Sequence, residues 1–178
     1  DGGEEEDIAS APIVQALNSC GATALCLDLI SIGIDSSLML ECVRLCVAML
    51  YREGGNLPVQ QTIYNYLKNT KSDLFFKQIH KSFQTLILWH KWHDIIILKE
   101  DQEVELPEDI ILVRFLQLLC EGHYQPNQDI MREQVTNSIS INLLDDYVAY
   151  LNCLSRIPCR TSTEAAIKVS STILEVIQ

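Results

Sequence analysis

Three residues that could form a nucleophilic site lie close together in the chain: Cys120, Glu121 and His123. Cysteine attacks as its thiolate, which a neighbouring imidazole can generate. Successive residues of a helix project about 100° apart, so Cys120 and His123 can face each other while Glu121 cannot join them. Neither a glycine-rich phosphate loop nor a nucleophile elbow accompanies these residues. They also fit a helix end with a histidine near its negative pole, and we expect that structural role and no catalytic residue.

Two further clusters have the residue types of metal ligands. His90 and His93 share a helix face, and Asp94 could add a ligand or orient a ring. Structural zinc needs four ligands, however, and no second Cys or His pair lies at finger-like spacing. Asp145 and Asp146 lack the alternating carboxylates and central glycine of a calcium loop. We expect the first cluster to be a partly exposed helix end and the aspartates a solvated face, with no metal and no cofactor.

Composition limits the classes of partner. Thirteen basic against 24 acidic residues give a net charge of −11, which repels nucleic acid and anionic lipid surfaces.

Seven cysteines, scattered singly, favour a reducing cytosolic compartment over a disulfide framework. No apolar run approaches the roughly 20 residues that a bilayer requires, and residues 1–7 are acidic instead of resembling a basic signal-peptide start. We therefore expect no direct membrane contact from this chain.

One arrangement of helix, glycine stop and second helix occurs twice. Residues 43–63 and 113–130 each begin with Val-Arg in an apolar helix that stops at glycine, and after a turn a Pro-x-Gln opens a second amphipathic helix. Glycine is favoured where a helix ends with positive φ, and proline is tolerated in the first turn of the next helix. A unit repeated about 70 residues later predicts an armadillo/HEAT-like α-solenoid of antiparallel helix pairs.

Helical spacing of apolar residues runs through most of the chain, and alternating strand patterns are nearly absent, so we predict an all-α fold. The helix that starts near residue 72 should fade near Trp92, because residues 95–97 are β-branched and residues 99–105 are highly charged. Four segments follow: an acidic tail without structure (1–7), a first helical lobe (8–98), a charged linker (99–107) and a second helical lobe (108–178). The predicted helices span residues 8–20, 23–32, 38–51, 58–67, 72–92, 112–120, 127–135, 142–154 and 162–177.

The second glycine stop lies in the run Phe-Leu-Gln-Leu-Leu-Cys-Glu-Gly-His, from Phe115 to His123. This run resembles the signature of the RIH-associated domain of inositol 1,4,5-trisphosphate receptors and ryanodine receptors. Upstream, Gly21-Ala22-Thr23, Gly54-Gly55-Asn56 and Val59-Gln60-Gln61 resemble the helical segment that precedes this domain in both receptors. Downstream, the likeness continues from Asn142-Leu143-Leu144 to the closing residues 174–178. The family-motif residues, which we expect to form structural turns and helix packing, are Gly54, Gly55, Asn56, Gln60, Phe115, Leu116, Gln117, Leu118, Leu119, Cys120, Glu121, Gly122 and His123.

The resemblance implies a cytosolic regulatory segment of a homotetrameric calcium-release channel of the endoplasmic or sarcoplasmic reticulum. Such a segment contacts the remainder of the channel polypeptide and neighbouring subunits, and it links distant ligand-binding modules to the gate. Both receptor types remain open. In ryanodine receptors an acidic residue in this region helps to bind activating calcium. Arg156 occupies the aligned position here, so we do not carry that calcium site over to this chain.

Two other classes of function remain open. A free-standing armadillo-like adaptor would hold a peptide or a partner helix in a solenoid groove. An enzyme using Cys120 and His123 would require that Cys120 be alkylated much faster at neutral pH than the other thiols, because a reactive cysteine needs a depressed pKa.

Overall fold

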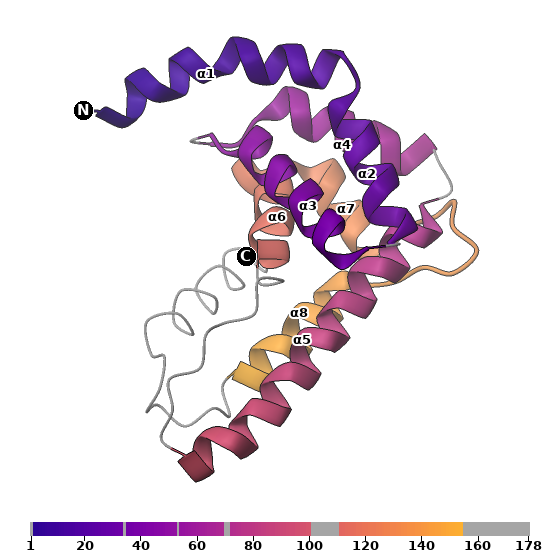
Figure 1. Cartoon of the computed structure of the whole chain (residues 1–178). Helices are drawn as coiled ribbons and strands as arrows, with labels where there is room; N and C mark the ends of the chain where they lie inside the picture. The colour runs from indigo at the N-terminus through magenta and orange to yellow at the C-terminus, as the bar shows by residue number, and fades with distance from the viewer. Residues whose placement is uncertain (1, 34, 53, 70–71, 101–110, 155–178) are drawn as a thin grey trace.

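The computed structural model describes residues 2–33, 35–52, 54–69, 72–100 and 111–154, and for residues 2–10, 92–100 and 154 only the course of the backbone. Every regular element within these ranges is helical, which confirms the all-α prediction (Figure 1). The predicted helix over 162–177 lies outside the described residues. The elements are α1 (Gly2–Ser19), α2 (Ala22–Ile32), α3 (Ser36–Leu50), α4 (Leu57–Asn69), α5 (Asp73–Glu100), α6 (Ile111–Cys120), η2 (Glu121–His123), α7 (Gln125–Arg132) and α8 (Leu143–Leu154).

Glycines and a capping aspartate set several helix ends. Gly21 and Gly33 flank α2 with φ of 91° and 57°, a left-handed conformation that glycine adopts without steric conflict. The Asp35 side chain accepts a hydrogen bond from the Leu38 N–H at 2.9 Å and so caps the first turn of α3. The loop between α2 and α3 is short because both ends are terminated locally.

Two helices are longer than predicted. α1 starts at Gly2, so the expectation of an unstructured tail is wrong for residues 2–7; acidic residues are favoured in a first helical turn, where the helix dipole is positive. α5 continues to Glu100, so the expectation that it fades near Trp92 is also wrong. β-Branched residues lower helix propensity by only about 0.5 kcal/mol each, which a long, already nucleated helix tolerates.

α7 is shorter than predicted, ending at Arg132 instead of residue 135. Glu133 has extended backbone angles, and the Gln134 side chain then bonds the backbone of the following loop. Its Oε1 accepts from the Ile141 N–H at 2.7 Å, and its Nε2 donates to the Ile141 carbonyl at 3.0 Å. A buried amide therefore replaces helical hydrogen bonds in fixing the path from α7 to α8.

The two helix-turn-helix units lie side by side. α3 packs against α6, and α4 packs against α7, while α2 contacts α1, α3, α4 and α5. α8 runs along α5, and Figure 1 shows this pair extending away from the other helices. Side chains buried on both sides of residues 101–110 form one apolar cluster. The largest fully buried side chains are Leu27, Ile30, Met49, Leu50, Ile63, Phe75, Phe76, Ile79, Phe83, Phe115, Tyr147 and Tyr150.

Among the described helices, none is by itself long and apolar enough to cross a membrane. Ala11–Ser19 and Ala22–Ile32 reach the required length and composition only when taken together, across a bend of 64°.

Candidate functional site at the contact of two glycine turns

The first glycine turn joins α3 to α4. Gly54 and Gly55 have φ of 72° and 86°, values that side-chain-bearing residues adopt only with strain. Asn56 closes the turn, because its Nδ2 donates a hydrogen bond to the Met49 carbonyl at 2.8 Å. The carbonyl groups of the last turn of a helix have no intrahelical partner, so Asn56 satisfies one of them at the end of α3.

The second glycine turn is η2, between α6 and α7. Gly122 and His123 both have positive φ, at 67° and 57°. A non-glycine residue in this region stores roughly 1 kcal/mol or more of strain, which the surrounding contacts must offset. The chain then enters α7 with Pro126 in its first turn, as predicted from the sequence.

The two turns meet backbone to backbone. A Cβ atom placed on Gly122 would lie 2.3 Å from the Gly54 carbonyl oxygen. A Cβ atom on Gly55 would lie 3.0 Å from the Glu121 carbonyl oxygen. We call this meeting of residues 54–56 with residues 121–123 the turn contact. It brings together motif residues that are far apart in the sequence and leaves no room for a side chain at Gly122.

Gln60 of α4 binds the end of α6. Its side chain is 1% exposed, and its Nε2 lies 3.0 Å from the Leu118 carbonyl oxygen and 2.9 Å from the Glu121 carbonyl oxygen. Asn127 of α7 adds a hydrogen bond from Nδ2 to the Leu119 carbonyl at 2.8 Å. Two buried amides thus satisfy carbonyl groups that the end of α6 leaves without helical partners.

The rest of the motif lies on α6 and packs inward. Gln117 is also buried, and it accepts a hydrogen bond from the Arg114 guanidinium. Arg114 in turn lies over the Tyr51 ring, 5.7 Å from its centroid, which adds a contact between α6 and the end of α3. The buried apolar motif residues are Phe115, Leu116, Leu118 and Leu119.

Cys120 lies in this packed region and not at an open site. Its Sγ is 3.2 Å from the Met131 Sδ, and burial raises the pKa of the Cys120 thiol to about 12, although the positive charge of Arg132 opposes the shift. A thiol with so high a pKa forms little thiolate at neutral pH. His123 follows Gly122 in the chain and is exposed, whereas Cys120 is buried.

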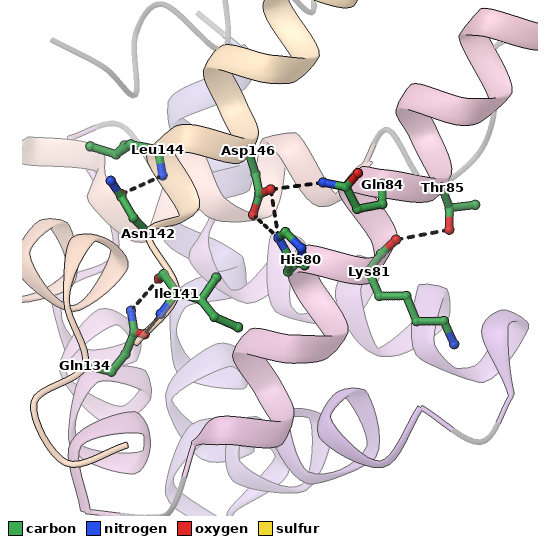
Figure 2. A network of polar contacts seen from close by, with 9 residues as sticks. All are labelled: His80, Lys81, Gln84, Thr85, Gln134, Ile141, Asn142, Leu144 and Asp146. Carbon is green, nitrogen blue, oxygen red and sulfur yellow. Dashed lines mark hydrogen bonds and ion pairs between the residues drawn. The ribbon is translucent and has the colours of Figure 1, made fainter. Parts of the chain in front are cut away.

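Polar and aromatic pairs join α5 to α8, and we call this line of contacts the α5–α8 seam. Figure 2 shows Asp146 reaching from α8 toward His80 and Gln84 of α5. The His80 Nδ1 lies 2.9 Å from Asp146 Oδ2. Asp146 is only 4% exposed, so the expectation of a solvated face is wrong for this residue. Burial raises the pKa of the Asp146 carboxyl, although the hydrogen bond and charge of His80 oppose the rise.

Aromatic rings continue the seam. Tyr147 and Tyr150 pack on Phe83 with ring centroids 5.0 and 6.2 Å apart, and the Tyr147 hydroxyl donates to the Val113 carbonyl at 3.2 Å. His90 lies with its Nε2 2.9 Å from the Tyr150 hydroxyl and is 4% exposed. The expectation of a partly exposed helix end is therefore wrong at His90, because a polar partner on α8 permits its burial.

In the described part of the chain, no three His, Cys, Asp or Glu side chains are grouped so as to hold a metal ion. The side chains of His93 and Asp94, and all of Arg156, lie outside the described residues.

The sequence match to known proteins covers the helices that form one side of both contacts. Residues 101–178 match the family model described as RyR and IP3R Homology associated. This part of the chain belongs to that family. The RyR and IP3R homology associated region therefore includes α6, η2, α7 and α8, and its described part docks on the upstream helices through the turn contact and the α5–α8 seam. The likeness noted for residues upstream of 101 stays a prediction.

The sequence assigned no role to His80 or Asn127, and it placed Asp146 on a solvated face. His80 and Asp146 bond each other across 66 residues, and Asn127 bonds the carbonyl groups of Leu119 and of Gln60, 67 residues away. The one available signal was for Asn127, which follows Pro126 in the same way that Val59 follows Pro58 in the first unit. A polar residue at an otherwise apolar position of a repeat indicates a specific buried partner.

Proposed function

We propose that the chain is a cytosolic coupling segment of a tetrameric intracellular calcium-release channel, and that it transmits ligand-induced movement toward the gate. The family match supports a region of a channel of the inositol trisphosphate and ryanodine receptor type. The remaining channel polypeptide and neighbouring subunits are the partners that this function requires, on the cytosolic face of an endoplasmic or sarcoplasmic reticulum membrane.

The turn contact is the observation that carries this proposal. Gly54 and Gly122 approach so closely that neither turn can shift without moving the other, and Gln60 holds the end of α6 through its carbonyl groups. Packed elements of this kind move as a unit, because close-packed interfaces do not deform continuously. Motion that enters the upstream helices is thereby passed to the homology associated region.

The stacking of helices supports a solenoid organisation of the segment. The α3–α4 unit lies beside the α6–α7 unit, with first helix against first helix and second against second. In solenoids, each repeat buries its apolar face on its neighbour. We propose that these two units are adjacent layers of an armadillo-like array that continues into the rest of the channel.

We also propose that the segment has no catalytic role. The raised pKa of Cys120 leaves little thiolate, and its thiol is enclosed by the packing between α6 and α7. Alkylation of Cys120 in the folded chain should be slower than that of the exposed Cys20, and faster alkylation of Cys120 would revive the enzyme hypothesis.

A first experiment separates a channel segment from a free-standing adaptor. An antibody raised against the chain would be used on membrane and soluble fractions of the source cells. The channel hypothesis predicts one polypeptide several-fold larger than the chain, in the membrane fraction and released only by detergent. A soluble species of the size of this chain would contradict it and favour the adaptor.

A second experiment tests coupling in the channel itself. Gln60→Glu replaces a donor with a carboxylate beside the Leu118 and Glu121 carbonyl groups, which repels the end of α6. In calcium-loaded store vesicles, this variant should need more activating ligand for half-maximal release while ligand binding to the channel stays unchanged. Gln61→Glu on the exposed face of α4 is the matched control. Equal release from wild type and Gln60→Glu would refute coupling through this contact.

A further inference from the structure

A groove of about 460 Å³ opens between α4 and α7. Its volume lies within the range of pockets that hold small ligands or anchoring side chains. The residues that form its wall come from both sides of the family-match boundary, so it exists only when the homology associated region is docked on α4.

The interior of the groove is apolar. Tyr64 of α4 and Pro126 and Ile130 of α7 line it, and the Tyr64 ring packs edge to face on Tyr124 behind the wall, with ring centroids 6.4 Å apart. Val135 stands at the rim with 87% of its surface exposed. Val135 therefore continues the apolar lining of the groove to its rim, and a contiguous apolar surface with polar edges is typical of an interaction site.

The rim on the α7 side is negative. Asp129 and Glu133 are four residues apart and line the groove, and Glu133 lies at the C-terminus of α7, where the helix dipole adds negative potential. Asp129 also accepts a hydrogen bond from the Gln125 side chain at 2.7 Å. Across the groove, Lys68 is the one basic side chain among the described residues of the wall, and its Nζ lies 5.4 Å from the centroid of the Tyr64 ring. The described wall thus carries two carboxylates against one ammonium.

We propose that this groove docks a cationic amphipathic helix of a partner protein. The partner inserts an apolar side chain among Tyr64, Pro126 and Ile130, and it places Lys or Arg residues one turn apart against Asp129 and Glu133. The four-residue spacing of the two carboxylates matches the spacing of side chains on one face of a helix. Burial of apolar anchors in a groove with charged edges is a common mode of helix recognition. The proposal does not depend on the role of the chain in a channel.

The test uses the whole 178-residue chain and a synthetic helical peptide of Ala, Leu and Lys as the probe. Titration calorimetry measures its Kd, and a peptide in which Glu replaces every Lys is the charge control. Val135→Lys and Glu133→Lys are the groove variants. Leu25→Lys on α2 is the control for Val135→Lys, since Leu25 is also exposed, at 58%, and the charge of the chain changes by the same amount. Glu41→Lys on α3 is the control for Glu133→Lys. Circular dichroism confirms that each variant is folded.

We expect the Lys peptide to bind the wild-type chain and the Glu peptide not to bind. Val135→Lys and Glu133→Lys should each weaken binding by about tenfold, and the Leu25 and Glu41 variants by no more than about twofold. Three results would overturn the proposal: no binding of the Lys peptide, equal weakening by the groove variants and their controls, or equal binding of the Glu peptide. The second result would assign the attraction to the net charge of the chain.

Discussion

The turn contact and the α5–α8 seam join the same two parts of the chain by different means. In the turn contact, backbone meets backbone, and the closest approach needs the absence of a side chain at Gly122. In the seam, side chains make the contact, from Asp146 with His80 to Tyr150 with His90. A contact between two backbones cannot be weakened gradually by substitution, because no side chain takes part in it. Each side-chain pair of the seam can be weakened by its own substitution. We infer that the turn contact fixes the register of the two parts and that the seam sets how firmly they hold.

The largest effect is expected at Gly122. Gly122→Ala places a methyl group against the Gly54 carbonyl oxygen and forces alanine to a φ of 67°. Strain and overpacking together should lower the free energy of unfolding by about 2–5 kcal/mol. Urea denaturation measures the change. Gly54→Ala is the control, because its φ is 72° but no atom lies within 4 Å of the added Cβ. It should cost about 1–2 kcal/mol, and an equal loss in both variants would contradict the contact.

A smaller loss is expected at Gln60. Gln60→Glu removes the buried donor and sets a carboxylate against carbonyl oxygens of Leu118 and Glu121, which should lower the free energy of unfolding by about 2–3 kcal/mol. The exposed Gln61→Glu should stay within about 0.5 kcal/mol of wild type in the same urea measurement. If the two variants are equally stable, the amide does not bind the end of α6.

Substitutions in the α5–α8 seam should lower the free energy of unfolding by less. Tyr147→Phe keeps the ring against Phe83 and removes one buried hydrogen bond to the Val113 carbonyl, so we expect a loss of about 1 kcal/mol. Tyr51→Phe, whose side chain is exposed, should change stability by less than about 0.5 kcal/mol. A Tyr147→Phe loss as large as that of Gly122→Ala would erase the distinction between the two contacts.

The smallest effect is a pH dependence from Asp146. Because the pKa of Asp146 is raised in the folded chain, the folded state holds this proton more tightly than the unfolded state does. Its stabilising contribution is therefore complete below the ordinary aspartate pKa and declines as pH rises through the raised value. Urea denaturation between about pH 4 and pH 7 should show Asp146→Asn gaining stability relative to wild type as pH increases. Tyr147→Phe should show no such trend in this window, and a flat difference for Asp146→Asn would contradict the raised pKa.

Much of the helical framework follows from local chemistry. Gly21, Gly33 and Gly54 have positive φ, a conformation that favours glycine, and Asp35 caps α3. The spacing of Tyr147 and Tyr150 indicates a core stripe, and both side chains are buried. Such features depend on neighbours within about one helical turn, so the sequence carries them directly.

The contacts between distant segments could not be derived in the same way. No property of Gly122 itself indicates that the Gly54 carbonyl fills the place of its missing side chain. Histidine and aspartate are residue types that usually lie at the surface, and His90 and Asp146 are buried only because each has a hydrogen-bond partner on the facing helix. The length of α5 differs from the prediction for another reason: local helix propensity at residues 95–97 understates how far an established helix continues.

The separation of these partners along the chain bears on synthesis at the ribosome. Gln60 lies 61 residues before Glu121, His80 lies 66 before Asp146, and His90 lies 60 before Tyr150. Translation at about 5–20 residues per second leaves an interval of about 3–13 s between each residue and its partner. During that interval, the apolar surfaces that α6 and α8 later cover on α3 and α5 have no permanent cover within this chain. A nascent chain paused before residue 111 should therefore be a preferred client for chaperones that bind exposed apolar helices.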